Sequence, residues 1–147
     1  MPFEFKMTHR VEFSETDMAG IIHFSSYFRY MEVTEHAFFR SLGISIAGQN
    51  AIHPVGWPRV KVAAEFRHPL QFEDEVEVHL LVREKGSKAL TYEFRFRKTN
   101  GGASINVGHG SLTVVCVAKD DSGKMKATSI PDEIARLIDQ APPELFQ

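Results

Sequence analysis

The sequence predicts an α+β fold in which an antiparallel sheet of five or more strands wraps around one long helix. One long segment, residues 24–42, carries apolar side chains at helical spacing. Later segments alternate apolar and polar side chains with a period of two, and short turns join them. Because these strands follow one another along the chain, they are expected to pair antiparallel on the helix.

The long helix is expected to bury one stripe of its surface. The apolar residues of this stripe are Phe24, Tyr27, Phe28, Met31, Phe38, Phe39 and Leu42. Gly43 follows at once, and glycine commonly ends a helix because it adopts positive φ easily. A strand-like run beginning at Val11 precedes the helix.

The strands expected after the helix cover residues 60–66, 76–82, 90–96 and 112–118. The first three alternate and are expected to be half-buried. The last is apolar on both faces, which indicates an inner strand covered by the helix on one side and by a partner subunit on the other. Asn100-Gly101-Gly102 offers positive-φ residues for a hairpin turn, and a last helix is expected from Pro131 to about Asp139.

Length and composition fit one soluble domain spanning residues 1–147. The formal net charge of -2 favours neither nucleic acid nor an anionic membrane. Cys116 lies in an apolar run, where a cysteine is more often a small core residue than a nucleophile. No apolar leader or membrane-length apolar run is present, so a cytoplasmic location is expected.

Residues 11–30, VEFSETDMAGIIHFSSYFRY, hold the groups best suited to chemistry. Asp17 precedes a Met-Ala-Gly turn, and the helix begins near Phe24, so a carboxylate can face unpaired helix N–H groups across a small gap. Those N–H groups can hold a carbonyl oxygen as it gains negative charge, while the carboxylate attacks the carbon or activates water. This chemistry suits a thioester and needs neither a metal nor a Ser-His pair. Taken alone, an Asp near a Gly is more commonly a turn or N-capping residue.

The same stretch resembles the 4-hydroxybenzoyl-CoA thioesterase family. The residues that match its pattern are Phe13, Glu15, Thr16, Asp17, Gly20, Ile21, Ile22, His23, Phe24 and Tyr27, with further matches at Phe66, Pro69, Asp74, Gly86-Ser87, Met125-Lys126 and Ile130-Pro131. The resemblance implies a hot-dog fold and an acyl-CoA thioesterase that acts on a small aryl-CoA or a short- or medium-chain acyl-CoA. It also implies a homo-oligomer built on dimers, with coenzyme A as part of the substrate and no cofactor.

The resemblance also implies roles for individual residues. Asp17 would be the nucleophile or general base, and the backbone N–H of Phe24 would polarise the thioester carbonyl. His23 is an additional candidate, although the branch of the family with a catalytic His has it at the position of Phe24; a packed, hydrogen-bonded histidine is the alternative. Gly20, Tyr27 and Trp57 would contact the substrate. Trp57 is expected to line the acyl pocket of a neighbouring subunit, and packing in the core or at an interface is the equal alternative.

The turn at residues 84–88 offers two ammonium groups, a hydroxyl and free backbone donors around a glycine, which together can bind phosphate. The resemblance assigns Lys85, Ser87 and Lys88 to the nucleotide end of coenzyme A, with Arg83 as an addition. A solvated hairpin is the alternative reading of the same residues.

Two acidic residues on the helix need a separate interpretation. Glu35 interrupts the apolar stripe, and we expect a solvated helix edge, with a contact to the site or across an interface as alternatives. With Glu32 and His36 it has metal-ligand spacing, but no second cluster completes a site, so no metal is expected.

Two other functions fit part of the pattern. One is a non-catalytic protein that binds acyl groups or CoA esters, and the retained Asp17 argues against it. The other is a hot-dog enoyl-CoA hydratase, which needs an Asp and His pair more tightly spaced than Asp17 and His23. The identity of the acyl group, and whether coenzyme A or acyl carrier protein carries it, remain open at this point.

Overall fold

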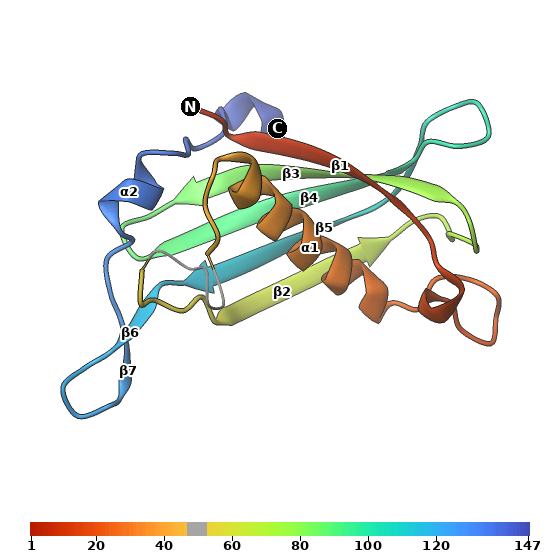
Figure 1. Cartoon of the computed structure of the whole chain (residues 1–147). Helices are drawn as coiled ribbons and strands as arrows, with labels where there is room; N and C mark the ends of the chain where they lie inside the picture. Colours follow the sequence, from red (N-terminus) through yellow and green to blue (C-terminus); the bar gives the residue numbers. More distant parts are fainter. Residues whose placement is uncertain (47–52) are drawn as a thin grey trace.

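The computed structural model of the chain describes residues 1–46 and 53–147. Its main sheet has the strand order β1-β3-β4-β5-β2, with every neighbouring pair antiparallel. The strands are β1 (Glu4–Arg10), β2 (Arg59–Phe66), β3 (Glu75–Lys85), β4 (Ala89–Lys98) and β5 (Ile105–Val115). The helix α1 (Ser25–Ser41) lies across one face of this sheet (Figure 1). The α+β prediction is confirmed.

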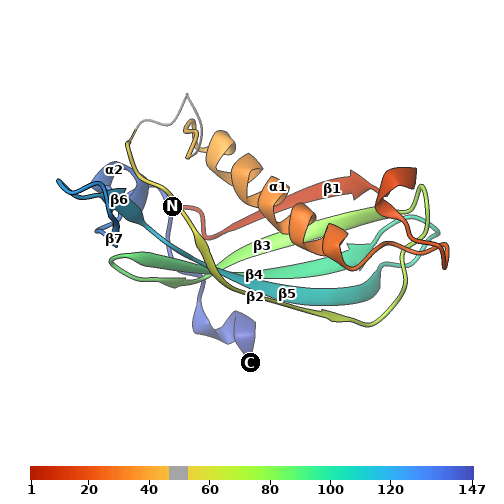
Figure 2. The same cartoon turned by 90° about the horizontal axis from the view of Figure 1, so that it is seen from below.

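The remaining elements are short. β6 (Val117–Lys119) and β7 (Met125–Ala127) form a hairpin beyond the main sheet, followed by α2 (Asp132–Ala135). Two 3-10 helices, η1 (Phe13–Glu15) and η2 (Pro143–Phe146), flank the fold. Figure 2 shows the C-terminal segment on the sheet face opposite α1. No helix in residues 1–46 or 53–147 is long and apolar enough to cross a membrane.

The core lies between α1 and the inner face of the sheet. Alternate residues of β3 and β4, such as Val78 and Phe94, are fully buried there, as is Met31 on the helix stripe. The helix approaches β5 closely at Gly110, where any Cβ would overlap the methyl end of Met31. Past the end of the helix, Gly43 has φ +87°, as expected for a residue that ends a helix. The predicted helix is therefore confirmed to within one residue at each end.

The strand expected from Val11 is wrong in position. β1 ends at Arg10, and the chain then turns into η1, with the Glu15 N–H donating to the Glu12 carbonyl at 2.9 Å. The Val11 N–H leaves the strand ladder and donates to the Asp74 carbonyl at 2.8 Å. Residues 11–15 thus lie at the end of the sheet and connect β1 to the loop that contains Asp17.

The expectation that β2 is half-buried is also wrong. Val60, Val62 and Phe66 are 58%, 45% and 51% exposed. The reason is that β2 is an edge strand and α1 crosses the sheet obliquely: its first turn contacts the end of β2 through Tyr27 and Phe66, and its last turn contacts β1 through Phe38 (Figure 1). The helix therefore covers β2 only in part, through Tyr27 at the end of the strand and through the ion pairs of Arg59 at its start.

The C-terminal expectations are partly confirmed. β5 is an inner strand, but the predicted strand 112–118 breaks after Val115, and Val117 starts β6. Cys116 between them is buried with a free thiol, and its N–H donates to the Lys88 carbonyl. Gly101 and Gly102 have φ +89° and +101° at the predicted turn. The last helix is much shorter than predicted, covering only Asp132–Ala135.

Asp74, in the turn before β3, is a buried carboxylate that stabilises this turn. It accepts hydrogen bonds from the Gln71 N–H at 2.8 Å and the Asn100 amide at 3.2 Å, and the Lys98 ammonium lies at 3.4 Å. Burial by itself raises the pKa of Asp74, but these donors outweigh it and lower the pKa below its ordinary value.

Candidate active site

Asp17 lies in a loop closed by its own backbone. Thr16 and Ile22 form an isolated antiparallel bridge, and the Asp17 N–H donates to the Ile21 carbonyl at 2.8 Å. The Gly20 N–H donates to the Asp17 carbonyl at 3.0 Å, and Gly20 has φ +81°, a conformation that favours glycine. Gly20 therefore shapes the loop that presents Asp17.

The carboxylate of Asp17 is exposed and lightly bonded. Oδ1 accepts a hydrogen bond from the Ala19 N–H at 2.8 Å, and the described residues place no other donor on this carboxylate. Its remaining lone pairs are free to meet a substrate or a water molecule.

At the start of α1 one backbone donor has no acceptor. The Ser25 N–H donates to His23 Nδ1, the Ser26 N–H to the His23 carbonyl and the Tyr27 N–H to the Phe24 carbonyl. The Phe24 N–H has no hydrogen-bond acceptor within residues 1–46 and 53–147. It lies at the positive end of the helix dipole, where an oxygen that gains negative charge is stabilised.

His23 is placed at the helix start and not in the cavity beside Asp17. Its Nδ1 lies 2.8 Å from the Ser25 hydroxyl and also accepts the Ser25 N–H, while its ring stacks on Phe24 at 4.7 Å. His23 is thus hydrogen-bonded and stacked at the helix start but exposed, and it is not among the residues that line the Asp17 cavity.

Asp17 and Phe24 line one cavity of about 470 Å³ between the loop, the helix start and the chain after β2. The cavity is lined by Asp17, Ile21, Ile22, Phe24, Tyr27, Phe66, Arg67, His68 and Pro69. Tyr27 forms part of its wall, with its ring 4.8 Å from Phe66 and edge-on to Phe96 at 5.1 Å. Burial raises the pKa of Tyr27 to about 12, so its hydroxyl stays protonated at neutral pH.

Sequence reasoning gave no role to two residues of this cavity, Arg67 and His68. The only signal was their position between Phe66 and Pro69, which match the family pattern. His68 Nδ1 lies 2.8 Å from the Pro69 carbonyl, an arrangement in which Nδ1 donates to this carbonyl. Arg67 is exposed and forms no ion pair within the part of the chain that the structure describes.

Trp57 and the residue 85–88 hairpin lie at the other end of the sheet from Asp17. Arg59 at the start of β2 and Leu90 at the start of β4 both pair with Val114, whereas Phe66 at the end of β2 pairs with Gly108. β2 has eight residues, which separates the two ends by about 25 Å at roughly 3.3 Å per residue. Within one chain these predicted binding residues therefore cannot share a ligand's acyl end with Asp17.

The hairpin side chains also differ in availability. Lys85 is half-buried and its ammonium donates to the Ile138 carbonyl at 2.8 Å. Arg83 forms an ion pair with Glu93 at 3.1 Å. Ser87 and Lys88 are exposed, and Lys88 forms no ion pair among the described residues.

The expectation that Glu35 lies on a solvated helix edge is wrong. Glu35 is 0% exposed, and its Oε1 lies 2.6 Å from an Arg59 nitrogen, so it joins α1 to β2. The same guanidinium lies 3.1 Å from Glu32 and donates to the Trp57 carbonyl. Burial raises the pKa of Glu35 despite the opposing charge of Arg59.

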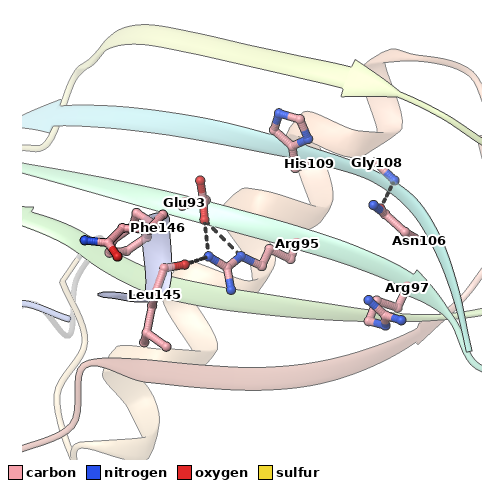
Figure 3. Close-up of a pocket in the computed structure, with 9 residues that line it drawn as sticks. Glu93, Arg95, Arg97, Asn106, Gly108, His109, Leu145 and Phe146 are labelled. Atoms are coloured by element: carbon pink, nitrogen blue, oxygen red, sulfur yellow. Dashed lines mark hydrogen bonds and ion pairs between the residues drawn. The ribbon is translucent and has the colours of Figure 1, made fainter. Parts of the chain in front are cut away.

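A second hollow, of about 260 Å³, lies on the sheet face away from α1 (Figure 3). Its charged side chains are largely paired: Glu93 holds Arg95, which also donates to the Leu145 carbonyl, and His109 contacts Glu65 at 2.6 Å. None of the predicted site residues lines it. The cavity beside Asp17 is therefore the candidate active site.

Comparison with known proteins defines the class. The model of the thioesterase-like superfamily matches residues 11–138, so the chain belongs to this superfamily and its enzyme class is that of thioester hydrolases. A relative in Aquifex aeolicus (strain VF5), provisionally named an esterase, is 33% identical over 141 residues, covering 94% of this chain and 98% of the relative.

Two further matches concern the fold. The 4-hydroxybenzoyl-CoA thioesterase of Pseudomonas sp. (strain CBS-3) is 23% identical over 133 residues, covering 89% of this chain and 94% of that enzyme. A structure of 4-hydroxybenzoyl-CoA thioesterase has a TM-score of 0.79 at 19% identity, covering 93% of this chain and 99% of that one. The fold is thus the hot-dog fold, as the sequence resemblance implied.

Proposed function

We propose that the protein is an acyl-CoA thioesterase that hydrolyses a small aryl-CoA or a short- or medium-chain acyl-CoA. The observation that carries the proposal is that Asp17 and Phe24, whose N–H has no acceptor among the described residues, line one largely apolar cavity. A thioester carbonyl between them meets a nucleophile or base at its carbon and a donor at its oxygen. Relatives named 4-hydroxybenzoyl-CoA thioesterase and 1,4-dihydroxy-2-naphthoyl-CoA hydrolase support an aryl acyl group.

In this proposal the thioester oxygen accepts a hydrogen bond from the Phe24 N–H, and the N-terminus of α1 stabilises its developing negative charge. Asp17 then either attacks the carbonyl carbon or takes a proton from the water that attacks it. In the first route the C–S bond breaks to leave an acyl-aspartyl anhydride, which water hydrolyses. Both routes consume one water and release the carboxylic acid and the free thiol of coenzyme A, without a cofactor.

We also propose a homodimer in which the β2 strands of two copies pair antiparallel. β2 is an edge strand with exposed Val60, Val62 and Phe66, and such an edge is a ready template for another strand. Antiparallel pairing sets the start of one β2 beside the end of the other. Trp57 of one subunit would then lie next to the Asp17 cavity of its partner.

The same arrangement gives the residue 85–88 hairpin a role. The hairpin lies at the same end of the sheet as Trp57. It would therefore face the partner's cavity and contact the nucleotide end of the coenzyme A bound there. Because Lys85 and Arg83 already have partners within the chain, Ser87 and Lys88 are the better phosphate contacts. A cytoplasmic location is part of this proposal, and the single buried cysteine, Cys116, is compatible with a reducing compartment.

The test is a panel of aryl-CoA and alkyl-CoA thioesters, with acyl-pantetheine and acyl carrier protein analogues, compared by kcat/KM from the release of free thiol. Thiol release with a clear preference among acyl groups supports the thioesterase. Tight binding of CoA esters without turnover would instead indicate a binding protein. Loss of an enoyl-CoA double bond without thiol release would indicate a hydratase.

A further inference from the structure

Glu15 lies two residues before Asp17 and its backbone ties the Asp17 loop to the start of α1. Its carbonyl oxygen accepts a hydrogen bond from the His23 N–H at 2.8 Å and from the Ser26 hydroxyl at 3.2 Å. His23 directly precedes Phe24, and Ser26 lies in the first turn of α1. A shift of Glu15 would therefore move the Asp17 loop relative to the Phe24 N–H.

The side chain of Glu15 is held from a second direction. Its Oε1 accepts a hydrogen bond from the Tyr30 hydroxyl at 2.7 Å and from the Glu12 N–H at 2.8 Å. Tyr30 comes from α1, one turn beyond Ser26, so the carboxylate and the carbonyl of the same residue both contact the helix. A rigid link with two attachment points fixes both position and orientation.

Tyr30 is itself immobilised. It is 3% exposed, and its ring stacks on His9 of β1, with ring centres 4.8 Å apart and planes 7° from parallel. Burial, reinforced by the Glu15 carboxylate, raises the pKa of Tyr30, so its hydroxyl remains a hydrogen-bond donor. Strand, helix and loop thus meet at the hydrogen bond from Tyr30 to Glu15.

We infer that Glu15 and Tyr30 are positioning residues that set the separation of the Asp17 carboxylate from the Phe24 N–H. The inference rests on the proposed function, because it assigns the two groups that must be aligned. Neither Glu15 nor Tyr30 is among the residues that line the cavity, so both would act through the groups that they hold in place. Replacing them would change the placement of the Asp17 carboxylate relative to the Phe24 N–H, and a misplacement of about 1 Å can lower the rate about 100-fold.

The test is a variant that removes the Tyr30 hydroxyl and keeps its ring. Tyr30→Phe retains the stack on His9, and we expect kcat for thioester hydrolysis to fall about 10- to 100-fold with KM changed less than about twofold. Glu15→Ala should behave alike, whereas Glu15→Gln, whose amide oxygen still accepts the tyrosine hydroxyl, should recover most of kcat. Thr113→Val is the matched control, since it removes a hydroxyl bonded to Thr91 Oγ1 at 2.9 Å, far from the cavity.

Amide hydrogen exchange gives a second readout. The Asp17 and His23 N–H groups should exchange faster in Tyr30→Phe than in the parent. Their exchange rates should be unchanged in the Thr113→Val control. A Tyr30→Phe kcat within twofold of the control, or a loss explained wholly by a smaller folded fraction, would overturn the inference. Asp17→Asn is measured in the same assay. An active Asp17→Asn variant would contradict the proposed function. An inactive Asp17→Asn variant together with a fully active Tyr30→Phe variant would contradict only the positioning role.

Discussion

Replacing Phe24 with proline deletes the proposed oxyanion donor with little change to the backbone. Phe24 has φ -56°, and proline fixes φ near -65 ± 15°, so the substitution fits the observed conformation. The lost N–H makes no hydrogen bond within the described residues, so no bond of α1 breaks. The variant also loses the Phe24 ring, so the donor is isolated only by comparison with a second variant that loses the ring and keeps the N–H.

The expected loss follows from the role of that donor. Removing one oxyanion-hole hydrogen bond costs about 10²–10³ in kcat, equivalent to about 2.7–4 kcal/mol. Phe24→Ala is the matched control, because it keeps the N–H and loses the ring that lines the cavity and stacks on His23. The alanine variant should mainly raise KM.

The assay follows thiol release over a range of substrate concentrations, with the melting temperature of each variant recorded alongside. If the Phe24 N–H binds the thioester oxygen, the kcat of Phe24→Pro should lie about 100-fold or more below that of Phe24→Ala. Equal kcat values in two folded variants would show that this N–H does not bind the thioester oxygen.

Three further predictions concern stability, ligand binding and assembly. The folded-state pKa of Asp74 is depressed, so its stabilisation is present above the unfolded pKa of about 3.9 and is lost as pH falls through the folded pKa. Asp74→Asn should lower the free energy of unfolding at pH 7 by about 1–2 kcal/mol, with the difference from the parent vanishing in strong acid, as urea titrations would measure. Lys88→Ala should raise KM for acyl-CoA but not for acyl-pantetheine, and the effect should be clearest at low salt. Lys85→Ala should also lower the melting temperature, because it loses the hydrogen bond to the Ile138 carbonyl. Equal KM values for acyl-CoA in Lys88→Ala and the parent would exclude the phosphate contact. Val62→Lys puts a charge on the exposed β2 edge and should shift the dimer to monomer in sedimentation, and an unchanged dimer would rule out pairing through β2.

The sequence predicted elements whose signal is local. The apolar stripe of α1 and the alternation of β3 and β4 are period signals that a few neighbouring residues carry, and both were confirmed. The alternation of Val60, Val62 and Phe66 is just as regular, yet that face is exposed, because periodicity marks an apolar face and does not say what covers it.

Long-range relations account for what the sequence did not predict. Glu35 is buried because Arg59, 24 residues later on β2, forms an ion pair with it. No local sequence pattern predicts that pair. Likewise, Arg67 and His68 join the Asp17 cavity only through the fold. Asp17 and Phe24 could be predicted together because one short loop carries both.

The most direct test of the account is the turnover of Asp17→Asn. This variant keeps the size of the side chain and the acceptor for the Ala19 N–H, but loses the charge needed to attack the carbonyl or to take a proton from water. Measured by thiol release in a single turnover, hydrolysis should fall by about 10²–10⁴ while the affinity for acyl-CoA, measured by calorimetry, stays close to that of the parent. A variant that binds substrate normally and retains most of its kcat would contradict the assignment of Asp17.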